Sequence, residues 1–548
     1  MRTPLTRRVL ATALALASAL TVATLTPTPA RADSGNTLNV AGTSDVSDSN
    51  LFAAVLKPGF EAAYPQYTVT YQGSATQVAI DNAKTGQFGA LIVHAASLEN
   101  QFVADGYSVE PYGRAIFWGD FVLLGPASDP AGVMSGGAVD ADPVDAFQKL
   151  AAAGQAGRAH LIARETGSGT DVASHAIWAA TSGVSTCAVS AANGGGTKPS
   201  TSTGDCPSTA ANPSWYITTG AKQAANIEYA DTCSPSSGAN DCYVFTDRGT
   251  YQYLASTNAV HNLQVVVRGS SNLLVNSFHA YAINPAAITG TTPAINQNEA
   301  QAFLNWITSP AAQKLIGNYL DSTNDAPFLP DAAPRLSANA LPASVKAGKP
   351  ITVSGSLKNV VPGTPALAGQ KVSLRSVPAG EPSAAPITVA TGTTDASGHI
   401  AISYTPTASA NYSLATGTIT QIENAALDPA FGDLLQPTSL TLTAGATTGG
   451  TVTVEGKVKL DKAKVKNHRL VLKGSIAPRA GLGATAVLYA SHPGHRLKVV
   501  KTKKLGVGAS TFHLKAKLKK GTWRYHVVYL NGQGSTSDKT ANKKVTVR

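Results

Sequence analysis

The sequence predicts two α/β lobes followed by two all-β sandwich modules of the Ig-like kind, and three observations lead to this fold class. Over residues 36–333, short apolar runs typical of strands alternate with segments whose apolar residues recur at helical spacing. After residue 334 helical spacing disappears, and short alternating runs are separated by Gly, Pro, Asn and Ser. The chain has 548 residues, more than one hydrophobic core usually organises.

The first 32 residues are typical of a secretory signal peptide. Arginines precede an apolar run at 9–25, and Ala-Arg-Ala at 30–32 offers a small-residue cleavage site. The run is too short and wrongly flanked for a membrane anchor. We therefore expect a secreted, extracellular monomer. The predicted domains are a signal peptide at 1–32, the α/β head at 33–334, one sandwich at 335–434 and a basic sandwich at 435–548.

Alternating patterns place the elements of the head. Strands are predicted at 37–40, 67–73 and 90–95, and helices at 51–64, 144–154, 172–181 and 299–320. Because about 300 residues is large for one open sheet, two lobes are predicted.

The loop Arg-Glu-Thr-Gly-Ser-Gly-Thr at 164–170 is the first candidate site. Glycines let backbone N–H groups turn toward one point, and the following helix adds its free amides and positive dipole end. Arg164 supplies a planar, permanently charged donor. Ser168 is not predicted to be a nucleophile, because no G-x-S-x-G elbow surrounds it and His175 lies two helical turns away. From these residues alone the loop is either an oxyanion cradle or a helix cap with a turn.

Two further strand-to-helix loops repeat this arrangement. Thr43 and Ser44 follow the first predicted strand, and Ser74 and Thr76 follow the second. Because such loops gather at the carboxyl ends of the strands in open sheets, they predict one cleft lined by neutral donors and Arg164.

Six segments, in order along residues 36–333, resemble the tungstate-binding proteins of bacterial ABC importers, within the bilobed periplasmic-binding superfamily. They are GTSDVSDSNLF (42–52), GALIVHAASLENQFVADGY (89–107), FWGDFVLLGPASDPAGV (117–133), ARETGSGTD (163–171), YVFTDRGTYQYL (243–254) and AFLNWITSPAAQKLIGNY (302–319). Similarity to phosphate-binding relatives rests mainly on R-x-x-G-S-G-T and leaves a phosphate-type ligand as an alternative.

The resemblance implies a two-lobed periplasmic-binding-protein fold that closes on tungstate or molybdate and presents it to an ABC permease. Independently, no His, Asp or Glu spacing resembles a metal hydrolase and no paired carboxylates stand out, so no enzyme activity, cofactor or metal is expected. Hinges are expected near 121–126 and 279–285, and selectivity from cavity size and from the absence of a hydrogen-bond acceptor. Arg248 matches a family position that braces the cleft or touches the ligand. The predicted ligand set is Thr43, Ser44, Ser74, Arg164, Ser168, Gly169, Thr170 and Arg248.

The first loop departs from the family pattern. Ala41 and Gly42 stand where relatives carry threonines, so one hydroxyl donor is missing. Asp45 and Asp48 bring negative charge close to the proposed anion site. They either face outward as acids of a helix N-terminus or weaken the site. His94 is interpreted as a structural residue near the cleft.

Four cysteines, Cys187, Cys206, Cys233 and Cys242, lie close together in a chain that we expect to be exported. Two disulfides are therefore predicted, with three possible pairings. The local pairing would close two short loops. A zinc site is disfavoured because the spacing does not fit one.

Charge is unevenly distributed. Residues 437–548 hold 22 Lys and Arg against 3 Asp and Glu, a net charge of +19. An anionic cell-wall polymer is the expected partner, and nucleic acid is not, because no aromatic stacking platform is evident. A merely solvated face is the alternative. A different functional hypothesis is a cell-wall-associated interaction protein whose head has been repurposed.

Overall fold

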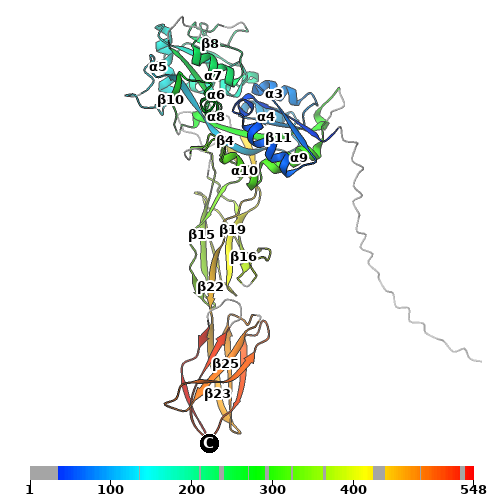
Figure 1. The fold of residues 1–548 in the computed structure, drawn as a ribbon, viewed down its shortest axis with the longest axis vertical. Helices are drawn as coiled ribbons and strands as arrows, with labels where there is room; N and C mark the ends of the chain where they lie inside the picture. Colours follow the sequence, from blue (N-terminus) through cyan, green and yellow to red (C-terminus); the bar gives the residue numbers. More distant parts are fainter. Residues whose placement is uncertain are drawn as a thin grey trace, which may run out of the picture.

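The computed structural model describes residues 35–134, 136–208, 211–233, 240–269, 271–290, 295–321, 325–361, 366–379, 381–423, 438–481, 483–530 and 537–548. The expected signal peptide lies outside the described residues. Within these ranges no helix is both long and apolar enough to cross a membrane. Figure 1 shows the α/β head, a first β-module and a second β-module following one another along the long axis of the molecule.

A twelve-stranded sheet runs through both lobes of the head. Its main path has the order β2-β1-β3-β11-β4-β9-β5-β8. These strands are β1 (Thr37–Thr43), β2 (Thr68–Ser74), β3 (Ala90–Val93), β4 (Gly113–Pro126), β5 (His160–Ala163), β8 (Tyr216–Thr218), β9 (Cys242–Asp247) and β11 (Val275–Ala282), with β10 (Leu263–Val267) and β12 (Leu329–Pro330) beside β4.

The long strand β4 is the first connection between the lobes. Its early residues pair with β11 as far as Asp120↔Val275, and its later residues pair with β9 from Phe121↔Asp247 onward. The strand therefore leaves the first lobe and enters the second between Asp120 and Phe121, next to the hinge expected at 121–126.

The second connection joins β10 to β11, and its described part includes the 3-10 helix η3 (Asn272–Leu274). The hinge expected at 279–285 is wrong, because β11 from His279 to Ala282 pairs with β3 inside the first lobe. These residues therefore lie within one lobe and away from the crossings between the lobes.

Helices flank the sheet in both lobes, and the apolar core of each lobe lies between its helices and its strands. The first lobe carries α1 (Ser44–Asp48), the π-helix η1 (Phe52–Leu56), α2 (Lys57–Ala63), α3 (Thr76–Ala83), α4 (Ala96–Ala104), η4 (Pro285–Ala287), α9 (Gln297–Ile307) and α10 (Pro310–Gly317). The second carries α5 (Pro143–Gln155), α6 (Gly169–Ala180), α7 (Gln223–Thr232), α8 (Arg248–Ser256), η2 (Ala191–Asn193) and the hairpin β6 (Thr186–Ala188) and β7 (Thr197–Pro199).

The helix expected at 299–320 is two helices. Ser309 caps α10 by accepting a hydrogen bond from Ala312 N at 3.3 Å, and Pro310 takes the first helical position. Proline fits a helix start because it has no N–H to leave unpaired, so the Ser-Pro pair ends one helix and begins the next.

Disulfides join Cys187 to Cys206 and Cys233 to Cys242. Of the three pairings open from the sequence, the structure contains the local one.

The first β-module contains two sheets around one apolar core. One sheet has β13 (Arg335–Ala338), β15 (Ile351–Lys358) and β18 (His399–Tyr404); the other has β14 (Ser344–Lys346), β16 (Lys371–Pro378), β17 (Ile387–Thr393), β19 (Ala410–Thr416) and β22 (Gly450–Glu455). The module boundary expected at 434/435 lies outside the described residues. It needs correction all the same, because β22 pairs with β19 and β14 of the first module.

The second β-module begins at Lys457 and repeats the arrangement of a three-stranded and a five-stranded sheet. The first sheet has β23 (Lys457–Lys466), β24 (Arg469–Ala477) and β27 (Thr511–Lys517); the second has β25 (Thr485–Ser491), β26 (Lys498–Lys504), β28 (Gly521–Leu530), β29 (Asp538–Lys539) and β30 (Lys543–Val547).

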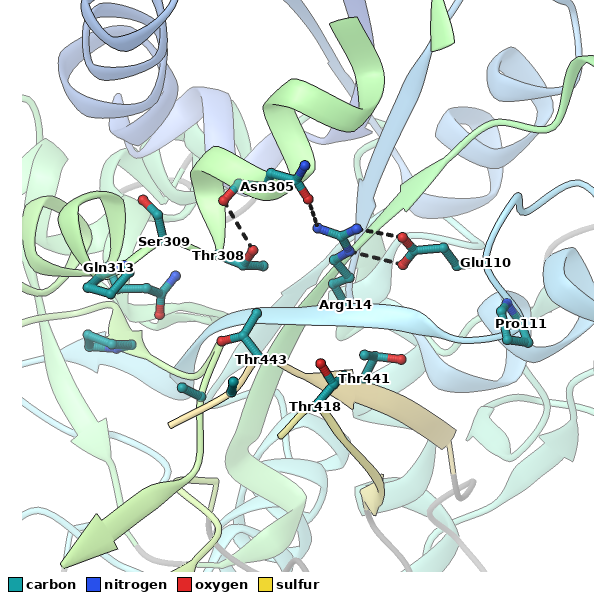
Figure 2. Close-up of a pocket in the computed structure, with 14 residues that line it drawn as sticks. Glu110, Pro111, Arg114, Asn305, Thr308, Ser309, Gln313, Thr418, Thr441 and Thr443 are labelled. Atoms are coloured by element: carbon teal, nitrogen blue, oxygen red, sulfur yellow. Dashed lines mark hydrogen bonds and ion pairs between the residues drawn. The ribbon is translucent and has the colours of Figure 1, made fainter. Parts of the chain in front are cut away.

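A hairpin of β20 (Ile419–Glu423) and β21 (Thr438–Leu442) ties the first β-module to the head. Strand β21 runs parallel to β4, with Thr441 opposite Arg114. Beside this junction lies an open groove, where Arg114 is held by Glu110 and by Asn305 (Figure 2). Among the described residues that line the groove, Arg114 is the sole cation, and Glu110 already pairs with it.

Candidate functional site

Loops from both lobes meet around a narrow space of about 140 Å³, part of it open to solvent, which in this state is too tight to hold a water molecule. Pockets for larger organic ligands typically have about 300–1,000 Å³, so no ligand of that size fits here. The cavity is lined by Thr43, Ser44, Asp45, Ser74, Thr76, His94, Arg164, Ser168, Gly169, Thr170 and Gln223. Seven of the eight sequence-predicted ligand residues are therefore brought together, and Arg248 is not among them.

Besides the short α1, which starts at Ser44, three longer helices begin at the cavity, with Thr76 first in α3, Gly169 first in α6 and Gln223 first in α7. The first N–H groups of a helix have no acceptor within the helix, and its N-terminus carries partial positive charge. Ser168 caps α6 by accepting from Asp171 N at 3.1 Å, and its own hydroxyl hydrogen remains available for donation. The cavity is thus surrounded by positive helix ends.

Two buried donors at the cavity have no hydrogen-bond partner among the described residues. They are the Thr76 hydroxyl and the Nε of Arg164. The Thr43 hydroxyl lies beside the Asp45 carboxylate and helps to lower the pKa of that group. The side chains of Thr76 and Arg164 are 0% and 3% exposed, so water does not reach them freely. Leaving a buried donor unpaired costs about 1–3 kcal/mol. Since both line the same cavity, a ligand with several acceptor oxygens would satisfy them together.

Arg164 reaches across the interlobe boundary. One terminal nitrogen donates to Ser44 Oγ of the first lobe at 3.3 Å, and the other donates to the Ala221 carbonyl of the second. The neighbouring Glu165 lies 3.4 Å from the same guanidinium and is partly exposed. The guanidinium is therefore fixed with Nε as its spare donor.

Asp45 does not face outward, as one interpretation of the sequence supposed. It is 2% exposed, lines the cavity and pairs with His94, its Oδ2 lying 3.0 Å from His94 Nε2. The other ring nitrogen of His94 is 2.6 Å from Asn276 Oδ1. Oxygen acceptors beside both ring nitrogens favour the charged imidazolium form of His94.

The ionisation of this pair follows from its contacts. Burial alone would raise the pKa of Asp45, but His94 and Arg164 hold that pKa below its ordinary value. Burial alone would lower the pKa of His94, but Asp45 and Asn276 raise it above its ordinary value. Asp45 and His94 are thus an ion pair with no net charge, and Arg164 is the remaining full charge among the residues that line the cavity.

The Asp45 carboxylate also places a hydrogen-bond acceptor on the cavity wall. The expectation that selectivity relies on the absence of an acceptor is therefore wrong. Close by, burial and then the charge of Asp45 raise the pKa of Asp247 to about 7. Asp247 caps α8 through the backbone and hydroxyl of Thr250.

Asp48 lies outside the cavity and links the two lobes. Its Oδ2 accepts from Ala224 N, near the start of α7, at 2.9 Å. A second link joins Gln77 N of the first lobe to the Gly167 carbonyl of the second at 3.0 Å. These bonds exist only when the lobes are together, so the structure describes a closed state.

Arg248 must be removed from the predicted ligand set. Its guanidinium is bound by the Asp120 carboxylate and by the carbonyls of Asp325 and Ala326. Arg268 bridges the same Asp120 to the Asp325 carboxylate. Because Asp120 ends the first-lobe part of β4, this network braces the crossing between the lobes, and Arg248 has the bracing role that its family position allowed.

The missing threonine at Gly42 has a steric cause. A Cβ there would lie 2.1 Å from the hydroxyl oxygen of Tyr71, which donates to the Thr43 carbonyl at 2.8 Å. Tyr71 thus takes the space that a side chain at residue 42 would need, and it fixes the backbone next to the Thr43 donor.

Four lining residues were outside the predicted set: Asp45, Thr76, His94 and Gln223. Thr76 could have been predicted from the sequence, since it lies in the second small polar loop. His94 and Asp45 were each considered alone, and their pairing depends on the tertiary structure. Gln223 had no local signal beyond starting a helix.

Comparison with known protein families decides the relationship. The model of the PBP superfamily domain matches residues 27–311, more than half of the chain. The chain belongs to the PBP superfamily. It is 30% identical over 298 residues to a protein of Haloferax volcanii assigned as an ABC transporter anion-binding protein, a match that covers 54% of this chain and 72% of the relative.

Two further members of the superfamily carry names that state a ligand. The tungstate-binding protein TupA of Peptoclostridium acidaminophilum is 28% identical over 295 residues, covering 54% of this chain and 85% of the relative. A solved tungstate-binding protein from Desulfovibrio alaskensis G20 is 27% identical, with a TM-score of 0.39, and covers 54% of this chain and 99% of its own.

Proposed function

We propose that the protein is a secreted solute-binding protein that encloses a tetrahedral oxyanion of the tungstate or molybdate class between its lobes and delivers it to an ABC importer. The observation that carries the proposal is the convergence of two unpartnered buried donors, from Thr76 and Arg164, on one cavity between the lobes. Relatives named for tungstate and anion binding support the ligand class.

In this cavity the anion is recognised by hydrogen-bond donors that are shielded from water. The anion exchanges its water shell for hydroxyls, helix-terminal amides and the Nε of Arg164. Because Asp45 and His94 neutralise each other, the anion meets the charge of Arg164 without a net opposing charge on the cavity wall. Asp48 and Gln77 hold the lobes together over the bound ion.

The first experiment is a calorimetric and thermal-shift titration of the full chain with tungstate, molybdate, sulfate, phosphate and chromate at matched ionic strength. A ligand that binds only the folded protein stabilises it by about 2.7 kcal/mol at a hundredfold excess over Kd. We expect selective stabilisation by tungstate or molybdate. No response to any of the five anions would contradict the proposal and favour a repurposed head in a surface interaction protein.

A phosphate-type ligand is the second candidate, favoured by one observation. The ionised Asp45 carboxylate on the cavity wall accepts hydrogen bonds only. Monohydrogen phosphate can donate its hydroxyl to this carboxylate, whereas a fully deprotonated dianion has no hydrogen to give. Because this buried carboxylate can accept a hydrogen bond from the ligand, it favours the protonated anion over the fully deprotonated one.

The variant Asp45→Asn separates the two candidates. If the ligand is a tungstate-type dianion, removing this negative charge leaves affinity unchanged or increases it. If the ligand is monohydrogen phosphate, the same change weakens binding by about tenfold or more, since a charge-assisted hydrogen bond is lost. Asp81→Asn, at an exposed position of α3 where the carboxylate accepts only from Gln77, is the matched control.

A further inference from the structure

The outer side of the three-stranded sheet in the second β-module is a dense array of cations, here called the basic face. Leu470, Leu472 and Leu514 point into the core, so the residues that alternate with them along β24 and β27 point outward. The basic face consists of Lys462, Lys464, Lys466, Arg469, Lys473, Lys515 and Lys517, all exposed.

Strand register places these cations in rows. Lys466 is opposite Arg469, and Arg469 is opposite Lys517, so one row crosses all three strands. Lys462 is likewise opposite Lys473. Neighbouring strands lie about 4.8 Å apart, and successive outward residues on one strand lie about 7 Å apart. Like charges directly opposite each other destabilise a sheet, so this array is not explained by the stability of the module.

The cations have no acidic partners within the described part of the chain. The nearby acid is Asp461 at the bulge of β23, at one end of the same outer side, where its carboxylate accepts from the Ser475 hydroxyl at 3.4 Å and lies 3.8 Å from Lys459. His513 sits in the row of Lys473, and its pKa is lowered by burial and then by Lys515, Lys473 and Lys503. The lysines therefore disfavour an additional positive charge at His513.

We propose that the basic face binds a linear phosphodiester polymer without bases, of the polyol-phosphate class. Charge complementarity selects a polyanion, and a flexible chain with recurring phosphates can follow rows of cations at this spacing. Six of the seven cations are lysines, which bind phosphate as point charges rather than as shaped bidentate partners. The partner is therefore recognised by its charge and repeat, and not by a folded surface.

Two features favour such a polymer over nucleic acid and fit the position of the module. The outward residues of β23, β24 and β27 include no Phe, Tyr or Trp, so bases would find no stacking partner on the basic face. Figure 1 shows the second β-module at the opposite end of the molecule from the head. A polymer bound there leaves the interlobe cavity unobstructed.

The test uses the full chain and an oligomer of poly(glycerol phosphate), with binding measured by calorimetry in about 50 mM salt, where exposed charges are weakly screened. The face variant carries Lys464→Gln, Lys473→Gln and Lys515→Gln. The control carries Lys539→Gln, Lys543→Gln and Lys544→Gln, three exposed lysines of the other sheet with the same loss of charge. We expect the face variant to bind about tenfold or more weakly, and the control within about threefold of the native chain.

Each alternative outcome is decisive. Equal losses in the two variants would show that net charge, and not the basic face, binds the polymer, and absence of binding by the native chain would refute the proposal directly. Tighter binding of single-stranded DNA with the same number of phosphates would identify a nucleic-acid surface instead. Polyglutamate bound as tightly as the phosphodiester would overturn the phosphate assignment. Circular dichroism verifies the fold of both variants, and their oxyanion binding in the head should be unchanged.

Discussion

The interlobe cavity and the basic face are two opposite arrangements of positive charge in one chain. The cavity has Arg164 and an Asp45–His94 ion pair, all at most 3% exposed on their side chains, with donors fixed around a space of about 140 Å³. The basic face has seven exposed cations in open rows with no carboxylate partner among the described residues. The cavity has little net charge and donors in fixed positions, whereas the basic face has a high positive charge and no enclosing walls.

This difference suits the cavity to selecting among small anions and the basic face to retaining the protein on a polyanion. In the cavity, buried donors without partners penalise every state except the one with a fitting ligand, so affinity depends on the shape and protonation of the anion. On the basic face each cation keeps its water shell, and attraction is long-ranged and tolerant of spacing. We infer that the head distinguishes between small anions, whereas the second β-module distinguishes only polyanions from other partners.

The largest expected effect is that of Arg164→Ala on oxyanion binding. The substitution removes the charged buried donor and leaves the anion inside the cavity without a counter-charge, which costs about 3 kcal/mol or more, roughly a hundredfold in Kd. Calorimetry with the anion chosen from the panel measures the effect. Arg158→Ala, an exposed arginine of the same lobe that donates to the Pro130 carbonyl, should bind normally. Native affinity in Arg164→Ala would show that the oxyanion is not bound in this cavity.

The next largest effect is that of Gly169→Ala. An added Cβ would lie 2.3 Å from His94 Nε2, and Asp45 and Asn276 hold that ring in place, so the lobes cannot close fully. We expect affinity for the oxyanion to fall by about tenfold or more, because a conformational penalty of 1.4 kcal/mol already costs a factor of ten. Gly417→Ala, where a Cβ meets nothing within 4 Å, is the control. Equal affinities for the two variants would show that closure does not depend on this contact.

Local sequence patterns predicted much of the head because its loops follow simple rules. A small polar loop between a strand and a helix must lie at the carboxyl end of that strand, so Thr43, Ser74 and Ser168 could be placed together. The break at Ser309-Pro310 was also visible in principle, since serine caps helices and proline starts them.

What the sequence could not show depends on contacts between distant segments. Asp45 and His94 are far apart in the chain, and neither reveals that it will neutralise the other. Arg248 resembled a ligand residue, but Asp120 and Asp325 use its donors. The position of β22 was misjudged because the hairpin β20–β21 interrupts the first β-module, and pairing with β4 of the head follows no local pattern.

Raising the salt concentration should weaken binding at the basic face by about tenfold and leave binding in the cavity nearly unchanged. Raising sodium chloride from about 50 to about 200 mM should weaken polymer binding by at least about tenfold, because several exposed contacts release counterions. Oxyanion binding in the head should change by less than about twofold, since buried charges are screened much less. Both titrations are done on the same full chain. If both affinities fall together, the anion is bound at exposed cations and the contrast between the regions fails.

The smallest effect is the dependence of oxyanion affinity on pH. The raised pKa of His94 means that its contribution to stability is complete below the ordinary value of 6.5 and is lost as pH rises through the raised value. The lowered pKa of Asp45 means that its contribution is present above 3.8 and is lost as pH falls through the lowered value. The ion pair is therefore intact between these two limits.

Above that window the cavity gains negative charge, because His94 loses its proton while Asp45 stays ionised, and because Asp247, with a pKa of about 7, ionises nearby. Affinity for a dianion should consequently fall by several-fold as pH rises, about 1.4 kcal/mol per tenfold. His94→Gln should bind more weakly at pH 6 and lose most of this dependence, leaving the part due to Asp247, while His261→Gln, at an exposed position, should keep the native profile. A flat native profile would mean that the pair does not set the charge of the cavity, and that Arg164 and the helix ends alone oppose the anion.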